Sequence, residues 1–166
     1  MDEIERELER AFRFSQREEY AQALKICDNV ISDHPNNSRG YRRRAYVNSR
    51  QRQHEKAVED IGIAISLDPI QPDYYFTRAR WLLNCGRPED ACRDLSEVLS
   101  LEERFGRGYY VESAYFYRAA AYLDIGLFKE ALQDCRNVRD GFVVYMKGGL
   151  RSKEDIERDA RAEGLS

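Results

Sequence analysis

The segment YRRRAYVNSRQRQHEKAVEDIGIAISLDP, residues 41–69, decides the fold because its landmarks recur along the 166-residue chain. Ala57 has one alanine 34 residues before it and another 34 residues after it, and a fourth follows 40 residues later. An Arg-Ala pair precedes each of these alanines at a constant distance. The repeated alanines are Ala11, Ala23, Ala45, Ala57, Ala79, Ala91, Ala119 and Ala131. A period of this length is typical of stacked helical hairpins.

The repeated positions resemble the signature of the tetratricopeptide repeat (TPR) family, in which aromatic and small residues alternate before a glycine turn, an alanine and a proline. The second unit matches that signature at Tyr41, Ala45, Ala57, Ala64 and Pro69. The other units keep the same register at Ala11, Phe14, Tyr20, Ala23 and Pro35, at Tyr75, Ala79, Gly86 and Ala91, and at Tyr115, Ala119, Tyr122, Gly126, Phe128 and Ala131. The resemblance covers roughly residues 4 to 139 and suggests a small stand-alone array.

The resemblance implies an all-α fold, a right-handed superhelical solenoid of four TPR-like helical hairpins with a C-terminal capping helix. We expect a single domain over residues 1–166, with repeats at about 4–37, 38–71, 72–105 and 112–140 and a C-terminal extension and cap over 141–166. Ser38 is the predicted N-cap of the second hairpin. Ser152 and Asp155 predict a capping box that opens the last helix. The sequence leaves the conformation of residues 141–151 open.

Composition and charge argue against several classes of protein. The net charge is −3, from 27 basic and 30 acidic residues, so we expect no nucleic-acid partner. No apolar run approaches the roughly 18 residues that a membrane span needs, so we expect no membrane partner either. The acidic N-terminal segment has no signal-peptide core, and a cytoplasmic location is therefore expected.

Catalytic and metal-binding motifs are missing from the sequence. It has no glycine-rich phosphate loop, no G-x-S-x-G and no H-E-x-x-H. His34 and His54 fall at turns without an evident partner, and the four cysteines form no C-x-x-C pair. Cys27 and Cys135 occupy a repeat position that is apolar in the other units, which indicates packing. We therefore expect a protein that is not an enzyme and that has no cofactor and no metal site.

An arginine is followed by an aspartate sixteen residues later in three of the four units. The pairs are Arg44 and Asp60, Arg78 and Asp94, and Arg118 and Asp134. In a helical hairpin this spacing places one residue on each antiparallel helix at the same level. Arginine and carboxylate groups suit a two-pronged hydrogen bond, so we predict three structural salt bridges within the hairpins. The first unit departs from the rule, because Ile26 stands where Arg10 would need an acid.

The resemblance implies a concave groove, lined by the first helix of each hairpin, that binds a partner. Helical phase predicts the groove residues Phe12, Arg39, Arg42, Arg43, Tyr46, Arg50, Phe76, Arg80, Phe116 and Tyr117. Arginine and aromatic side chains are enriched at the energetic centres of protein interfaces. Two other interpretations stand beside this one. In the first, the arginines form a solvated face or are neutralised by Glu5 and Glu9 of the preceding helix. In the second, the aromatic residues pack against residues 142–146 folding back into the groove.

The predicted function is non-catalytic binding of a protein or peptide partner. TPR co-chaperones that clamp the acidic tail of heat-shock chaperones use five polar or basic side chains, and the corresponding residues here are Leu8, Phe12, Arg43, Asp73 and Thr77, so that clamp is not expected. A groove of mixed charge with aromatic residues suits a folded, charged partner, which favours an immunity protein that neutralises a bacterial toxin. The alternatives are a secretion-type chaperone and a self-associating structural adaptor that forms a homodimer.

Overall fold

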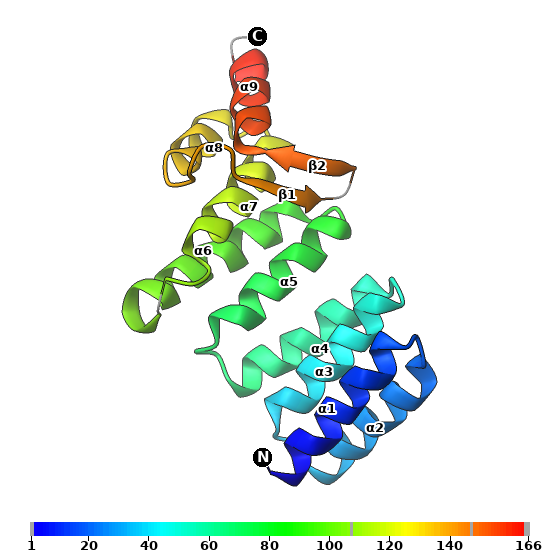
Figure 1. Ribbon diagram of the computed structural model, residues 1–166. Coiled ribbons are helices and arrows are strands. Elements are labelled where there is room, and N and C mark those ends of the chain that lie inside the picture. The colour runs from blue at the N-terminus through cyan, green and yellow to red at the C-terminus, as the bar shows by residue number, and fades with distance from the viewer. Residues whose placement is uncertain (1, 107, 147, 165–166) are drawn as a thin grey trace. The chain divides into compact units, whose positions relative to one another are not determined.

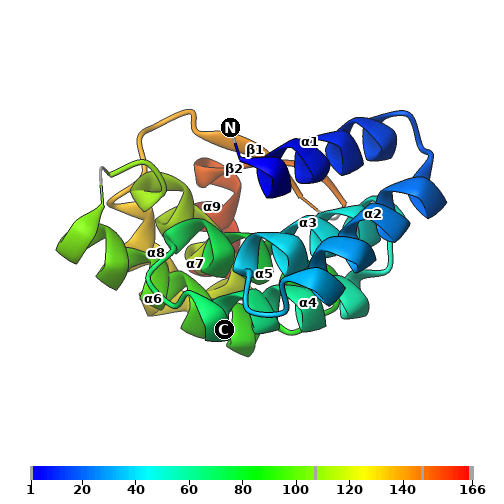
Figure 2. The same ribbon diagram turned by 90° about the horizontal axis from the view of Figure 1, so that it is seen from below.

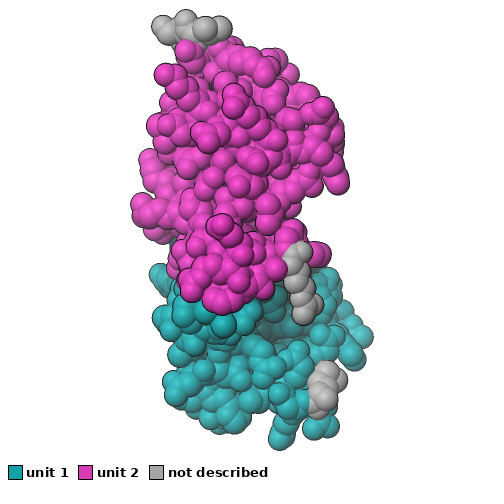
Figure 3. Space-filling view, turned by 90° about the vertical axis from the view of Figure 1, so that its left-hand side faces the viewer, with its two compact units in different colours: residues 1–74 teal, residues 75–166 magenta. Residues whose placement is uncertain are grey.

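The computed structural model describes residues 2–106, 108–146 and 148–164. The chain divides into two compact units, residues 1–74 and residues 75–166 (Figure 3). The boundary falls inside the helix α5 (Pro72–Asn84). Of the C-terminal extension predicted from the sequence, Lys147, Leu165 and Ser166 lie outside the described residues. The prediction of a single domain over residues 1–166 stays a prediction.

The first unit contains two antiparallel helix pairs, visible in Figures 1 and 2. The helices are α1 (Glu3–Gln16), α2 (Tyr20–Asp33), α3 (Ser38–Arg50) and α4 (His54–Leu67). Helix α2 packs against α3, and α1 also contacts α3, so the first helices of the two pairs are neighbours. The repeated alanines Ala11, Ala23, Ala45 and Ala57 are fully buried, because a methyl group allows two helix backbones to approach closely. The predicted hairpins of the first two repeats are confirmed.

One helix end in the first unit differs from the expectation. Asn37, not Ser38, is the N-cap of α3, and its side chain accepts a hydrogen bond from the backbone N–H of Arg39 at 3.0 Å. The Ser38 hydroxyl lies 3.1 Å from the hydroxyl of Tyr74 instead. The prediction of Ser38 as the cap was wrong because asparagine and serine are both good caps and stand next to each other here.

The second unit continues the helical pairs and ends in a small hairpin. Its elements after α5 are α6 (Pro88–Phe105), α7 (Val111–Asp124), α8 (Phe128–Cys135), β1 (Val143–Met146), β2 (Gly149–Ser152) and α9 (Lys153–Gly164). Strands β1 and β2 pair antiparallel, with Tyr145 opposite Leu150 (Figure 1). The sequence had left this segment open, because the short apolar run over residues 142–146 suits a strand, a helix end or a segment that fills the groove.

Helix α9 caps the second unit as predicted. The Ser152 hydroxyl and backbone N–H both donate to Asp155 Oδ2, and the backbone N–H of Asp155 donates to Ser152 Oγ at 3.1 Å, so the capping box is confirmed. Helix α9 packs on α7 and α8 and buries Ile156 and Ala160. Its other residues are largely charged, and such a polar outer face is what the end of a repeat array requires.

The turn inside each hairpin places one residue in the left-handed conformation. The residues are Glu18, Arg52, Gly86 and Gly126, with φ angles of 63°, 59°, 72° and 76°.

Replacing Arg52 by glycine is expected to raise the free energy of unfolding by about 0.5 kcal/mol, since relief of backbone strain exceeds the added entropy of the unfolded chain. Gly86→Ala is expected to lower it by about 1 kcal/mol through the backbone alone, because no atom lies within 4 Å of the added Cβ.

Urea unfolding curves of the wild type and the two variants test this prediction. A loss of stability in Arg52→Gly, with an unchanged slope of the unfolding free energy against urea, would show that the Arg52 side chain contributes more than its backbone strain costs.

Candidate partner-binding site

The three predicted arginine–aspartate pairs lie inside their hairpins, and each is joined by two hydrogen bonds. Arg44 donates to Asp60 at 2.6 and 3.0 Å. The corresponding distances are 2.7 and 2.8 Å from Arg78 to Asp94 and 2.7 and 2.8 Å from Arg118 to Asp134. The aspartate side chains are only 8%, 7% and 6% exposed. These arginines therefore form ion pairs inside their own hairpins.

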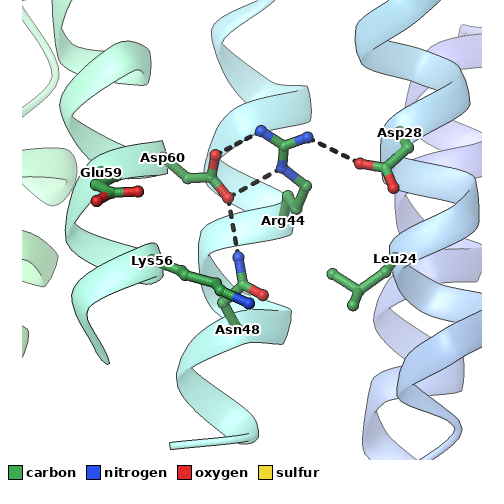
Figure 4. Close-up of a pocket in the computed structure, with 7 residues that line it drawn as sticks. All are labelled: Leu24, Asp28, Arg44, Asn48, Lys56, Glu59 and Asp60. Atoms are coloured by element: carbon green, nitrogen blue, oxygen red, sulfur yellow. Dashed lines mark hydrogen bonds and ion pairs between the residues drawn. The ribbon is translucent and has the colours of Figure 1, made fainter. Parts of the chain in front are cut away.

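The same arginines also reach the preceding hairpin, a contact that the sequence reasoning missed. Arg44 Nη1 donates to Asp28 of α2 at 2.8 Å (Figure 4), and Arg118 Nη1 donates to Ser96 of α6 at 2.8 Å. Asp28 and Ser96 occupy the same repeat position, and Gly62 stands there in the unit between them. The distance to the arginine differs, 16 residues from Asp28 to Arg44 and 22 from Ser96 to Arg118, so no constant spacing in the sequence marks this contact.

A pocket of about 270 Å³ lies beside Arg44, between α2, α3 and α4 (Figure 4). It is lined by Leu24, Asp28, Arg44, Asn48, Lys56, Glu59 and Asp60. Its central charges satisfy one another, because Arg44 binds two carboxylates and Asn48 donates to Asp60 at 3.0 Å. The hydrogen bond to Asp60 is the main reason why the pKa of Arg44 is raised. Arg44, Asp28 and Asp60 are therefore paired within this pocket, whereas Lys56 and Glu59 form no ion pair with a described residue.

The first helices of the two pairs in residues 1–74 carry a different surface. We call it the α1–α3 face and define it by Phe12 of α1 with Arg39, Arg42, Arg43, Tyr46 and Arg50 of α3. Phe12 is its centre: the Arg43 guanidinium lies 4.8 Å above the Phe12 ring, and the ring of Tyr46 lies 5.5 Å from it. The structure thus brings together Phe12, Arg43 and Tyr46, three of the six groove residues that the sequence placed in the first two hairpins.

Two arginines of this face have carboxylate partners. Arg39 donates to Glu5 at 2.8 Å and to Asp2 at 3.3 Å. Arg42 pairs with Asp73 at 2.9 Å. The interpretation that an acid of the first helix neutralises the face is therefore correct for Arg39.

The other two arginines of the face, Arg43 and Arg50, form no ion pair with any residue that the structure describes. Arg50 is exposed, whereas Arg43 is partly buried. Burial lowers the pKa of Arg43 from its ordinary value, and the positive charge of Arg42 acts in the same direction. The α1–α3 face thus keeps two positive charges for a partner.

The aromatic residues predicted for the groove in the second unit are not available to a partner. Phe116 is 0% exposed, and Phe76 and Tyr117 are also buried. The rings of Phe76 and Tyr117 are 5.6 Å apart, and Phe142 lies 5.2 Å from Phe116. The prediction that these three residues line an open groove was wrong, because aromatic neighbours from elsewhere in the unit cover them.

The C-terminal segment covers these rings only in part. Phe142 lies against Phe116, as the alternative of a self-filled groove anticipated for residues 142–146, whereas Val143 and Tyr145 are exposed. Of the four groove residues predicted in this unit, only Arg80 is exposed, with its guanidinium 5.7 Å above the ring of Tyr117.

The described residues contain no group of side chains that could hold a metal ion and no helix that could span a membrane. Within residues 2–106, 108–146 and 148–164, no three His, Cys, Asp or Glu side chains are placed to hold a metal ion. No helix in the part of the chain that the structure describes is long and apolar enough to cross a membrane. Burial raises the pKa of Cys27 to about 12 and the pKa of Cys92 and Cys135 to about 11, so these thiols stay protonated and pack as small apolar groups.

No family model matches the chain. The mouse DnaJ homolog subfamily C member 7 is 36% identical over 84 residues, which is 51% of this chain and only 16% of that protein.

Two solved structures share the fold. The TPR2B domain of yeast Sti1 in its pHsp70 complex has a TM-score of 0.66 and 19% identity over 71% of this chain and 94% of its own. The Yersinia enterocolitica secretion chaperone SycD, in complex with a peptide of the translocator YopD, has a TM-score of 0.67 and 19% identity over 75% and 96%. The chain thus has the fold of TPR-repeat structures.

Proposed function

We propose that this chain binds a protein partner through the α1–α3 face. The observation that carries the proposal is that Arg43, which lies over the Phe12 ring, and Arg50, which follows Tyr46 by one helical turn, form no ion pair with a described residue. Arginine and aromatic groups that are held in place by their neighbours supply much of the binding energy in protein interfaces. The arginines that pair with aspartates inside the hairpins stabilise the scaffold and leave this face to the partner.

The finer function we propose is that of a chaperone-type binder of a partner segment. Its support is the likeness in fold to SycD, whose structure holds a peptide of YopD. The role of a toxin-neutralising immunity protein, favoured from the sequence, rests on the mixed charge of the face alone. The two roles differ in the form of the bound partner, which is an extended segment in the first and a folded protein in the second.

Affinity purification from the source cells tests the proposal. We expect the wild-type chain to retain a partner. The amount of partner retained by the variant Arg43→Gln plus Arg50→Gln should be lower by at least about tenfold, because the charged contacts to the partner disappear. The matched control, Lys25→Gln plus Lys56→Gln, removes the same charge from exposed positions on α2 and α4 and should retain the partner. Equal retention by both double variants would contradict the proposal. Melting temperatures close to the wild type would exclude unfolding as the cause.

Self-association is a second candidate, favoured by the β1–β2 hairpin. Val143, Tyr145 and Leu150 are 51%, 75% and 74% exposed on it, which is unusual for large apolar side chains. If the hairpin joins two copies, light scattering should report a dimer that Tyr145→Lys converts to a monomer, because a buried lysine would lose its hydration. A mass that stays monomeric at every concentration would exclude this candidate.

A further inference from the structure

Arg43 is an unusual member of the α1–α3 face, because it is partly buried and forms no ion pair with a residue that the structure describes. The three arginines nearest to it in α3 each have a carboxylate partner: Arg39 binds Glu5, Arg42 binds Asp73 and Arg44 binds Asp60. Glu9 acts on Arg43 only at longer range, because its carboxylate is paired with Arg13 at 3.3 Å. A desolvated cation without a counterion costs free energy that an incoming anion would recover.

Tyr46 adds a second donor beside this guanidinium. Gln16 Nε2 donates to the Tyr46 hydroxyl oxygen at 2.9 Å, so the hydroxyl accepts from Gln16 and keeps its own hydrogen for another group. Arg43 and Tyr46 stand three residues apart on α3 and therefore share one side of the helix. Both contact the ring of Phe12, at 4.8 and 5.5 Å, which holds them next to each other.

We propose that Arg43 and Tyr46 form a subsite for the carboxylate of an aspartate or glutamate side chain in an extended segment of the partner, with Phe12 as the apolar floor. This inference rests on the proposed function and names the chemistry of the partner. The carboxylate accepts from the guanidinium and from the tyrosine hydroxyl, and the methylene groups of the same side chain lie on the Phe12 ring.

The charges around the subsite come from both helices of the face. Helix α3 contains five arginines and no acidic residue, whereas the facing helix α1 contains Glu5 and Glu9. The arginines attract a phosphate of nearly two negative charges about twice as strongly as a carboxylate of one, and these carboxylates repel it about twice as strongly, so the two anions are compared directly in the test.

Selection of peptides on the complete chain tests the subsite. A phage library of random peptides is selected on the wild type, on Arg43→Gln and on the control Lys25→Gln. We expect an aspartate or glutamate to be enriched at one position on the wild type and the control and not on Arg43→Gln. The selected peptide is then made with glutamate, glutamine or phosphoserine at that position, and its affinity is measured by fluorescence anisotropy.

The expected result is a thermodynamic coupling between the acid and Arg43. Exchange of glutamate for glutamine should weaken binding to the wild type by roughly tenfold and binding to Arg43→Gln by less than about twofold. Tyr46→Phe, which keeps the ring on Phe12, should weaken binding of the glutamate peptide by roughly fivefold. Circular dichroism confirms that each variant is folded.

Several outcomes would overturn the subsite, and they are distinguishable from failure of the proposed function. Phosphoserine that binds more tightly than glutamate would assign a phosphate site, and an equal loss in Lys25→Gln would show general charge attraction. Peptides without an enriched acid that still depend on Tyr46 would end the carboxylate assignment while the proposed function stands. Peptides indifferent to both Arg43 and Tyr46, or no selected peptide at all, would overturn the subsite, and the cellular purification would then decide the proposed function separately.

Discussion

Replacing Asp134 by alanine is expected to lower the free energy of unfolding by about 3–5 kcal/mol. The Asp134 side chain is 6% exposed and receives two hydrogen bonds from Arg118, whose side chain is 17% exposed. Removing the carboxylate leaves the guanidinium in a desolvated position with only the Ser96 hydroxyl as an acceptor. Urea unfolding followed by circular dichroism measures the loss.

Two further variants separate the charge effect from the loss of packing. Arg118→Met combined with Asp134→Leu removes both charges and should recover most of the stability, since replacing a buried ion pair by apolar groups of similar size is often nearly neutral. Asp28→Ala is the surface control, because this aspartate is 57% exposed and Arg44 keeps its two bonds to Asp60, so we expect a change below about 1 kcal/mol. A loss in Asp134→Ala no larger than that of Asp28→Ala would show that the pair contributes little to folding.

Replacing Phe116 by alanine is expected to lower the free energy of unfolding by about 3–5 kcal/mol. Phe116 is 0% exposed and packs against Phe142 and Tyr117, with ring centroids 5.2 and 5.9 Å away, so alanine leaves a cavity that the second unit cannot fill without rearrangement. Thermal and urea unfolding measure the effect. Phe116→Leu should cost less, because it keeps most of the apolar volume.

Phe116→Ala also distinguishes between the two interpretations of Phe116, as a residue of an open groove or as a residue of the core. A residue of an open groove would lose partner binding on truncation and keep its stability. A residue of the core loses stability first, as the structure implies. Wild-type stability together with lost binding in Phe116→Ala would therefore contradict the buried position.

The repeat architecture was accessible from the sequence because its causes are local. The period of 34 residues sets the hairpins, and the buried alanines mark where two helices approach each other. The spacing of sixteen residues from Arg118 to Asp134 is a property of any hairpin of this geometry, so the pairing followed from it. The capping box at Ser152 involves four consecutive residues and was predicted for the same reason.

The candidate site was accessible only in part. Helical phase assigned Arg39, Arg42 and Arg43 to one face of α3, but it does not show which acidic residues of other helices lie next to them. The acidic residues that form ion pairs with Arg39 lie at the start of α1, and the one that pairs with Arg42 lies on α5. The sequence therefore does not distinguish Arg43 from the other arginines of α3. The structure does, because it shows carboxylate partners for the neighbouring arginines and none among the described residues for Arg43.

The sequence by itself determined the helices, their pairing into hairpins and the arginines and aspartates that join them, since these depend on residues within one repeat. Only the tertiary structure decided which charges stay unpaired and which aromatic rings are covered. Phe116 is buried by Phe142, which lies outside its own hairpin, and Arg43 is held on Phe12 of the preceding hairpin. The physical reason is that burial and the pairing of charges depend on groups brought together from distant parts of the chain, and no local pattern encodes their distances.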